Sequence, residues 1–535
     1  MQHDALYYPS PSRRMAAFGT RGMVATSQPL AAQVGMSILQ QGGNAVDAAI
    51  ASAAALTVVE PTSNGLGSDV FAIVWIDGKL HGLNASGPAP QAASIEAMKA
   101  LGHDHVPNHG LLPVTVPGAP AAWAALSERF GKLPFAELLA PAVALAEEGF
   151  AVSPVIHQMW NEAFHSYSAY HDAAFTPWFD TFAPDGRAPQ PGERWSSPGH
   201  ASSLRAIAET QGRAFYEGEL ADKIDAFFRE HGGLLRKEDL ARFEPEWVDP
   251  ISVRYKGHDI WEIPPNGSGL IVLQALGMLE RMGPEGRDPV ETLHRRIEAT
   301  KLAYVDGFAH ITEREAMRPS VEQMLDDGYL KARAGLIGEQ AVDPVHGNPL
   351  TGGTVYLATA DGDGNMVSFI QSNFKGFGSG IVIPGTGISL QNRGWSFSLD
   401  PEHPNALAPG KRTYHTIIPG FITKDGQAIG PFGVMGGYMQ PQGHVQVITA
   451  MLDDHLNPQA ALDMPRWKWT QGKTVEVEPH FPDHLAQALA RRGHDIVKVA
   501  DTISFGRGQI ILRDSASGVL SGGTEPRTDG AVVPW

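Results

Sequence analysis

A glycine pair followed by a threonine, Gly352-Gly353-Thr354, is the stretch of this sequence best suited to covalent chemistry. A threonine hydroxyl is a poor nucleophile until a base takes its proton, and an N-terminal threonine can use its own α-amine, whose reference pKa is about 7.7–8.0. Cleavage between Gly353 and Thr354 would create that base together with the nucleophile. The glycines allow the backbone to turn the hydroxyl onto the preceding carbonyl. The alternative is an ordinary turn that leads into a strand.

Other kinds of site find little support in the composition. The 535 residues include no cysteine, which excludes disulfides, thiolate metal sites and a cysteine nucleophile. Covalent chemistry must therefore use Ser, Thr, Lys or a carboxylate. His103, His105 and His109 lie in one polar stretch, but without an H-E-x-x-H pattern. The sequence predicts no metal site and no cofactor.

The charge of the chain points to a small-molecule substrate. The 41 Lys and Arg against 58 Asp and Glu give a formal net charge of -17, which argues against binding to nucleic acid or to an anionic membrane surface. The N-terminal stretch lacks the apolar region of a secretory signal, and no run approaches the roughly 18 apolar residues of a membrane span. We expect a cytoplasmic protein, although a chain that had lost a leader would look the same.

Helical patterns dominate the first two thirds of the chain. Ser27 is expected to cap a helix that ends near Gln41, and Asn44 a small-residue, buried helix that runs to about Val58. Further helical patterns cover residues 119–150 and 288–310.

Short strands interrupt and then follow these helices. Residues 70–76 and 79–84 flank Asp77-Gly78, a dipeptide suited to a tight hairpin turn. After Gly353 the pattern changes to strands over 354–360 and 366–371 around a polar turn. No repeat, low-complexity tract or long linker separates the two parts. The sequence therefore favours one α+β domain built from both halves.

Six stretches in one order resemble the γ-glutamyltranspeptidase family and together cover nearly the whole chain. They are GGNAVDAAIASAAALTVVEP (42–61), VPGAPAAWAALSERFGKLPFAELLAPAVALAEEGF (116–150), PPNGSGLIVLQALG (264–277), GGTVYLATADGDGNMVSF (352–369), GVMGGYMQPQGHVQV (433–447) and GGTEPRTDG (522–530). The resemblance implies a four-layer αββα N-terminal-nucleophile hydrolase fold. It also implies a large subunit of residues 1–353 and a small subunit of residues 354–535, intertwined after autocleavage.

The resemblance assigns roles to individual residues of this chain. Thr354 is the expected nucleophile, exposed by a cut after Gly353. Ser372 is the expected helper, whose hydroxyl could hydrogen-bond the Thr354 side chain or amine, and the alternative is a strand-end serine that faces solvent. The pair Gly436-Gly437 is expected to direct backbone N–H groups at the developing oxyanion, where removing one donor typically costs about 2.7–4 kcal/mol.

The sequence departs from the family where a γ-glutamyl group is bound. The stretch 86–90 lacks the arginine that holds the α-carboxylate, and the serine pair falls at His415-Thr416. The carboxylate that pairs with the α-amine falls at Ser396. An unpaired ammonium in a desolvated pocket is costly, so simple γ-glutamate recognition is not predicted.

Other side chains could replace the missing contacts. Arg393 could bind a carboxylate from another direction, with Arg412 as a second candidate, although either could serve a structural ion pair. Tyr438 could line an acyl pocket or belong to the core. The stretch 397–411 is shorter than the lid-bearing segment of the best-known members, which favours hydrolysis over transfer.

We therefore predict an autoprocessing amidohydrolase that resembles γ-glutamyltranspeptidases. Thr354 attacks an amide or γ-glutamyl bond, and water or an acceptor amine releases the acyl group. The alternatives are hydrolysis of another small amide, as in oxamate amidohydrolases or cephalosporin acylases, and a non-catalytic binding protein on the same fold. The expected partners are a small amide substrate and the two fragments of one precursor, with a higher oligomer possible and no nucleic acid or membrane.

Overall fold

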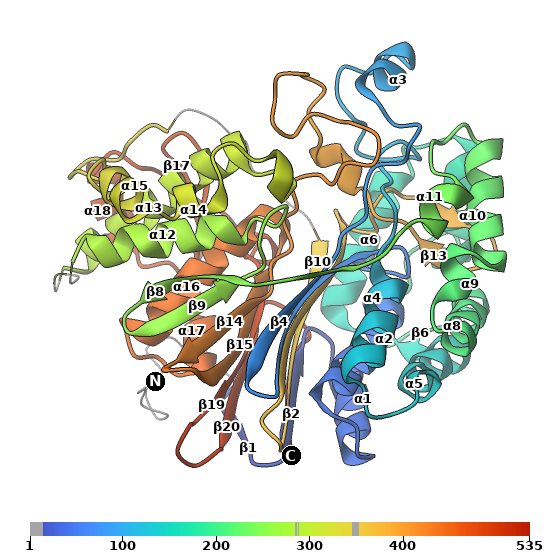
Figure 1. Ribbon diagram of the computed structural model, residues 1–535, viewed down its shortest axis with the longest axis horizontal. Helices are drawn as coiled ribbons and strands as arrows, with labels where there is room; N and C mark the ends of the chain where they lie inside the picture. The colour runs from blue at the N-terminus through green and yellow to red at the C-terminus, as the bar shows by residue number, and fades with distance from the viewer. Residues whose placement is uncertain (1–13, 284–285, 287, 345–352) are drawn as a thin grey trace.

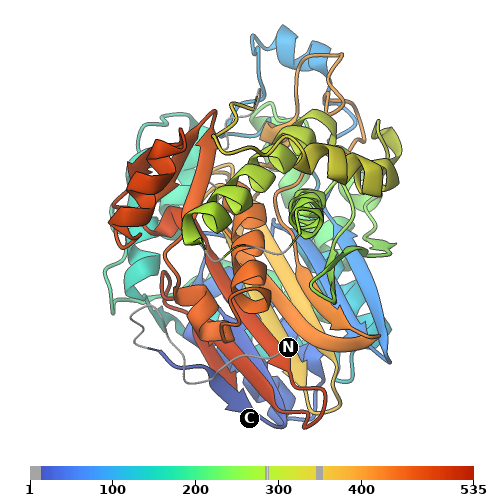
Figure 2. The same ribbon diagram turned by 90° about the vertical axis from the view of Figure 1, so that its left-hand side faces the viewer.

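Four layers make up the molecule, with two facing β-sheets enclosed between two layers of helices. The computed structural model describes residues 14–283, 286, 288–344 and 353–535. Figure 1 shows the two sheets side by side, with α12, α13 and α16 outside one and α1, α2 and α5 outside the other, and Figure 2 gives the perpendicular view. The αββα arrangement predicted from the sequence is confirmed.

The first sheet has seven strands in the order β1-β20-β19-β15-β14-β9-β8, and all neighbours in it are antiparallel. Its strands are β1 (Ala17–Gly19), β20 (Leu520–Thr524), β19 (Arg507–Arg513), β15 (Gln427–Met435), β14 (Gly420–Lys424), β9 (His258–Glu262) and β8 (Ile251–Tyr255).

The second sheet has seven strands in the order β21-β2-β10-β11-β3-β4-β7 and is also antiparallel. Its strands are β21 (Ala531–Pro534), β2 (Gly22–Thr26), β10 (Gly353–Asp361), β11 (Met366–Phe374), β3 (Asp69–Ile76), β4 (Lys79–Ala85) and β7 (Glu246–Val248). The two sheets meet face to face. Tyr356 of β10 packs against Gly433 of β15, where an added Cβ would lie 2.4 Å from the ring.

Helices from different parts of the chain cover the two outer faces. On the second sheet and its flank lie α1 (Pro29–Gln40), α2 (Ala45–Val59), α4 (Ala119–Phe130), α5 (Phe135–Glu148) and α8 (Pro198–Thr210). On the first sheet and its flank lie α12 (Gly269–Arg281), α13 (Pro289–His310), α15 (Asp327–Ala334), α16 (Gln440–Leu452), α17 (Pro458–Asp463) and α18 (Asp483–Arg491).

Shorter elements complete the described chain. The remaining helices are α3 (Ile95–Ala100), α6 (Pro154–Tyr167), α7 (Thr176–Phe182), α9 (Arg213–Tyr216), α10 (Glu219–Glu230), α11 (Lys237–Ala241) and α14 (Val321–Met324). The remaining strands are β5 (Phe150–Ala151), β6 (Arg194–Trp195), β12 (Val382–Ile383), β13 (Ile388–Ser389), β16 (Trp467–Gln471), β17 (Thr474–Val477) and β18 (Asp495–Lys498). Among the described residues, no helix combines the length and apolar character needed to cross a membrane.

Local sequence signals explain several of these boundaries. The Asn44 side chain caps α2 through a capping box with Asp47, as expected from the sequence. Asp77 and Gly78 both adopt positive φ in the turn between β3 and β4. The expected cap on α1 was wrong by one residue, because the Ser27 hydroxyl donates to Glu60 and the side chain of Gln28 accepts the N–H groups of the first turn instead.

Candidate functional site

Thr354 lies near the start of β10 and directs its hydroxyl at the neighbouring strand β11. The pairing of the two strands shifts register between Gly353 and Val355, which makes a β-bulge at Thr354, and a bulge re-aims side chains. Thr354 Oγ1 and Ser372 Oγ share a hydrogen bond of 3.0 Å, and both residues are fully buried. The Ser372 hydroxyl also accepts a bond from the N–H of Phe374 at 2.8 Å. The structure thus brings the expected nucleophile and helper into contact.

Gly436 and Gly437 form the turn between β15 and α16. Their φ angles are +128° and +57°, in the region that favours glycine, and a Cβ on Gly436 would lie 3.1 Å from the Cα of Gly506. Backbone N–H groups just before a helix have no partner within it and can face a developing negative charge. The side chain of Gln440, the first residue of α16, contacts Thr354. The helix that follows the glycine turn therefore begins beside Thr354.

Two residues that the sequence analysis missed hold Thr354 from different directions. Gln440 Nε2 donates to Thr354 Oγ1 at 3.4 Å. Arg507 Nη2 donates to the Thr354 carbonyl at 3.3 Å, while Nη1 of the same arginine contacts Glu60 Oε1 at 3.2 Å. Side chain and main chain of Thr354 are thus both fixed. The only available signal for Gln440 was its position three residues after the glycine pair.

Arg393 is fully buried between an acid and an aromatic ring. Its guanidinium carbon lies 3.9 Å from the ring centroid of Phe374, and Nε lies 3.7 Å from Asp69 Oδ2, beyond hydrogen-bond distance. Asp69 is directly opposite Ser372 in the pairing of β3 with β11. Nε and Nη2 of Arg393 donate no hydrogen bond to any residue that the structure describes. Arg393 is thus paired with Asp69 by charge and not by a hydrogen bond.

His415 and Thr416 lie against this arginine and its acid. Thr416 Oγ1 accepts a bond from Arg393 Nη1 at 3.0 Å. His415 Nδ1 accepts from the N–H of Ile417, so the ring carries its proton on Nε2, which donates to Asp69 Oδ2 at 2.9 Å. Burial keeps the pKa of His415 well below its ordinary value, so the ring is neutral. Both residues orient the Arg393–Asp69 pair.

The surroundings of Arg393 are poor in negative charge. Burial raises the pKa of Asp69 to about 7, although the Arg393 charge acts in the opposite direction. Lys375 lies with Nζ 3.2 Å from the ring centroid of Trp395, and burial and the Arg393 charge lower its pKa to about 8. Within the described chain, no carboxylate oxygen lies within 4 Å of Lys375 Nζ. Two cationic side chains thus lie close together in a chain whose net charge is -17.

A cavity of about 590 Å³ opens beside the glycine turn. The rings of Tyr438 and Tyr414 stack in its wall with centroids 6.0 Å apart. Ser396 Oγ and Tyr414 Oη are buried there without a hydrogen-bond partner among the described residues. The remaining lining residues are Phe308, Ala309, Ile311, Phe397, Ser398, Asp400, Glu402, His403, Pro404 and Asn405.

Comparison with known families accounts for this arrangement. The model of the gamma-glutamyltranspeptidase family matches residues 31–535. The chain belongs to the γ-glutamyltranspeptidase family. The predicted class, an amidohydrolase of the N-terminal-nucleophile type, is confirmed at the level of this family.

Relatives within the γ-glutamyltranspeptidase family carry different names. A solved structure described as cephalosporin acylase from Bacillus halodurans is 61% identical, covers 99% of each chain and has a TM-score of 0.95. The glutathione hydrolase-like YwrD proenzyme of Bacillus subtilis is 37% identical over 97% of this chain and 99% of its own. The oxamate amidohydrolase proenzyme of Klebsiella pneumoniae is 35% identical over 96% of this chain and 99% of its own.

The structure separates the two arginines considered from the sequence. Arg412 Nη1 pairs with Glu246 at 2.9 Å, and its Nε donates to the carbonyl of Ser86 at 2.9 Å, so its charge is already matched. Arg393 has its charge opposed by Asp69, with Nε 3.7 Å from Oδ2, but its Nε and Nη2 donate no hydrogen bond to a described residue. Of the proposed cleavage site, Gly353 and Thr354 are described in β10, whereas Gly352 lies outside the described residues.

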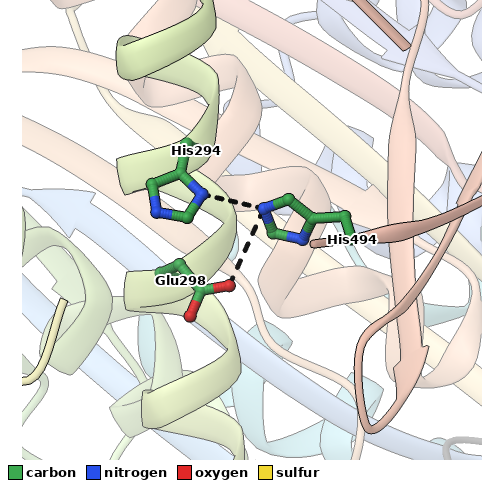
Figure 3. A group of neighbouring side chains, drawn as sticks. All are labelled: His294, Glu298 and His494. Carbon is green, nitrogen blue, oxygen red and sulfur yellow. Dashed lines mark hydrogen bonds and ion pairs between the residues drawn. The ribbon is translucent and has the colours of Figure 1, made fainter. Parts of the chain in front are cut away.

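A second polar cluster lies away from Thr354 and was also missed. His294, Glu298 and His494 converge in the buried space beside α13 (Figure 3). His294 Nε2 donates to the carbonyl of Gly338 at 3.0 Å, so its Nδ1 accepts from His494 Nε2 at 2.8 Å. Burial lowers the pKa of both histidines, that of His494 to about 3.

A buried lysine, Lys301, neutralises the carboxylate of this cluster. Lys301 Nζ lies 2.6 Å from Glu298 Oε1 and also donates to the carbonyl of Val342, whose N–H donates to Glu298 Oε2. All atoms of both charged side chains are buried. The ammonium occupies the place beside the carboxylate that a metal ion would need. The contacts favour a structural junction that ties α13 to residues 338–342 over a metal centre.

Proposed function

We propose that this chain is an autoprocessing amidohydrolase whose nucleophile is Thr354. Cleavage after Gly353 would leave residues 1–353 and 354–535 as large and small subunits. The observation that supports the proposal most directly is the 3.0 Å hydrogen bond between Thr354 Oγ1 and Ser372 Oγ in a fully buried setting. A buried hydroxyl pair at a bulge next to a glycine turn is suited to acyl transfer.

The proposed catalytic cycle uses one oxygen twice. In the cut protein the free α-amine of Thr354 takes the hydroxyl proton, and Oγ1 attacks the substrate carbonyl. The N–H groups of Gly436 and Gly437 stabilise the resulting oxyanion, and Ser372 keeps the hydroxyl oriented. The amine product leaves with the proton, and water then attacks the ester to release the acid and restore Thr354.

The substrate class follows from the charges around Arg393. We propose an amide whose acyl part carries a carboxylate that binds the unpartnered Nε and Nη2 of Arg393, with Lys375 adding positive charge. Asp69 is a poor partner for a substrate ammonium, since it already accepts from His415 and Gly87 and its pKa is about 7. Acyl groups with an α-amine, such as γ-glutamyl, are therefore expected to be weaker substrates.

The cavity supports hydrolysis over transfer. The short stretch around residues 398–405 lines part of the cavity, and its Asp400 and Glu402 make that lining polar, which favours water as the acceptor. A volume of about 590 Å³ also leaves room for amides larger than oxamate, including the bulky kind implied by the name cephalosporin acylase. Ser396 and Tyr438 line this cavity, whereas His415 and Thr416 contact Asp69 and Arg393, respectively.

Two further expectations belong to this proposal. The fragments of one precursor remain associated after the cut, because strands of both contribute to each sheet. A cytoplasmic location and a higher oligomer remain expectations from the sequence.

The proposal is tested by following the purified wild-type chain and a Thr354→Ala variant with intact-mass analysis and N-terminal sequencing. Wild type should yield a fragment that begins at Thr354, and the variant should stay whole because it has no hydroxyl. Thr354→Ser keeps a hydroxyl and should still be cut.

Thr359→Ala is the matched control, since it removes a hydroxyl from the same strand that donates to the carbonyl of Ala45 and not to the site. It should be cut like wild type. A folded wild-type chain that stays intact, or Thr354→Ala cut at the same bond, would refute the assignment and favour a binding protein on this fold.

A further inference from the structure

The amide of Gln440 is held in one orientation next to the nucleophile. Its Oε1 accepts from the backbone N–H of Ile418 at 3.1 Å, and its Nε2 lies 3.4 Å from Thr354 Oγ1. A backbone N–H only donates, so the oxygen of the amide must face Ile418 and the NH₂ must face Thr354. Gln440 and Thr354 are both fully buried. The N–H of Gln440 is thus a fixed donor to the nucleophilic oxygen.

This contact differs from that of the glycine turn. The N–H groups of Gly436 and Gly437 serve the oxygen of the carbonyl under attack, whereas Gln440 serves the attacking oxygen itself. Because Oγ1 accepts from Gln440, the proton of the threonine hydroxyl is left to donate elsewhere, with Ser372 Oγ at 3.0 Å as one acceptor. Charge that gathers on Oγ1 therefore meets a donor that needs no reorganisation.

We propose that Gln440 is a further catalytic residue, which stabilises Thr354 Oγ1 whenever that oxygen gains negative charge. This inference rests on the proposed function. In self-cleavage, Oγ1 bonds to the Gly353 carbonyl carbon, the carbon–nitrogen bond breaks, and the hydroxyl proton ends on the Thr354 nitrogen. Water then adds to the ester, Oγ1 leaves with the bonding electron pair and takes a proton, and Gly353 becomes a carboxylate.

Negative charge also builds up on Thr354 Oγ1 in each turnover of a substrate. Oγ1 attacks the substrate amide and later leaves the acyl group when water attacks. A donor on this oxygen lowers the barrier for both steps, as long as charge builds up on Oγ1 in the transition state. A hydrogen bond to a charged partner corresponds to about a 10- to 100-fold change in rate.

Self-cleavage of freshly made chains tests the proposal without any substrate. Full-length Gln440→Leu, Gln440→Glu and wild type are synthesised in a cell-free system, transferred to buffers from pH 5.5 to 8.5, and the intact chain is followed over time on denaturing gels. Gln440→Leu should be cut about 10- to 100-fold more slowly than wild type at every pH. Gln446→Glu is the control, since Gln446 lies on the same helix as Gln440 and its amide contacts the backbone of Trp467 in β16. It should match wild type.

The pH dependence of Gln440→Glu separates catalysis from packing. A protonated carboxyl can donate to Oγ1 and an ionised one cannot, so the rate relative to wild type should rise as the pH falls. If Gln440→Leu is cut as fast as wild type, or if Gln440→Glu is slowed equally at every pH, the role of Gln440 is refuted. Failure of wild type itself to cut would instead refute the proposed function.

Discussion

Replacing Arg393 by methionine should change which amides the enzyme accepts. Methionine keeps a long apolar stem against the Phe374 ring and removes the guanidinium donors. A hydrogen bond to a charged group is worth about 1.5–3 kcal/mol. The two donors that make no hydrogen bond to any described residue would bind the substrate carboxylate, so their loss should remove at least about 3 kcal/mol of substrate binding energy. For a substrate with a carboxylate on its acyl part, kcat/KM should fall by at least about 100-fold.

The fold should survive this change because Asp69 can take up a proton. The Arg393 charge lowers the pKa of Asp69, which burial nevertheless raises to about 7. Without the guanidinium, the pKa rises further, and the carboxyl is neutral at pH 7. The variant then contains no bare buried carboxylate, which would be strongly destabilising.

Three p-nitroanilides with acyl chains of equal length separate a loss of carboxylate binding from a nonspecific loss of activity. The glutaric monoamide has a carboxylate without an amine, the γ-glutamyl amide has both, and the pentanoyl amide has neither. Arg393→Met should reduce hydrolysis of the first and leave the third within about threefold. Arg412→Met, whose arginine already pairs with Glu246, is the control and should keep the wild-type preference. Equal loss on the glutaric and pentanoyl amides would refute the role of Arg393.

Two further predictions concern the free energy of unfolding, measured with urea. Both use the Thr354→Ala variant as background, because it should remain a single uncut chain. Burial raises the pKa of Asp69 in the folded state to about 7, so between pH 4 and pH 7 the folded state holds a proton that the unfolded state has lost. The free energy of unfolding should therefore fall by about 3 kcal/mol as the pH rises from 4 to 7. Asp69→Asn should remove this part of the slope, and an unchanged slope would contradict the reasoning. Glu298→Gln should cost about 3–5 kcal/mol because it leaves the buried ammonium of Lys301 without its counter-charge. Adding Lys301→Met should recover part of that loss, and strictly additive losses would contradict the coupling.

Local chemistry was sufficient to predict much of the fold. The capping box at Asn44 and the turn at Asp77-Gly78 depend on side chains and backbone within a few residues, so the sequence pattern contains them. The expected cap at Ser27 failed because Glu60, 33 residues away, binds that hydroxyl. A capping rule has no access to such a tertiary competitor.

The candidate site likewise contains residues that a sequence motif predicts and residues that only the tertiary structure brings together. Thr354 and Ser372 could be proposed because a family motif fixes their spacing along one hairpin. Asp69 lies on β3, and only the register of β3 with β11 puts it opposite Ser372. Gln440 reaches Thr354 because α16 starts immediately after the glycine turn, and its amide orientation depends on Ile418. No periodicity in the sequence encodes either contact.

The position of β10 explains how a cut beside Thr354 can preserve the site. β10 pairs with β11 over its length and with β2 over residues 357–361, at the end distant from the bond to be cut. The strand bearing the nucleophile is therefore held on one side by the hairpin of its own fragment and on the other by a strand of the preceding fragment. Arg507 adds a bond to the Thr354 carbonyl. The proposed cleavage would free an amine at the start of β10, while these contacts would keep Oγ1 beside Ser372 and Gln440, so the proposed maturation would require no refolding of the sheet.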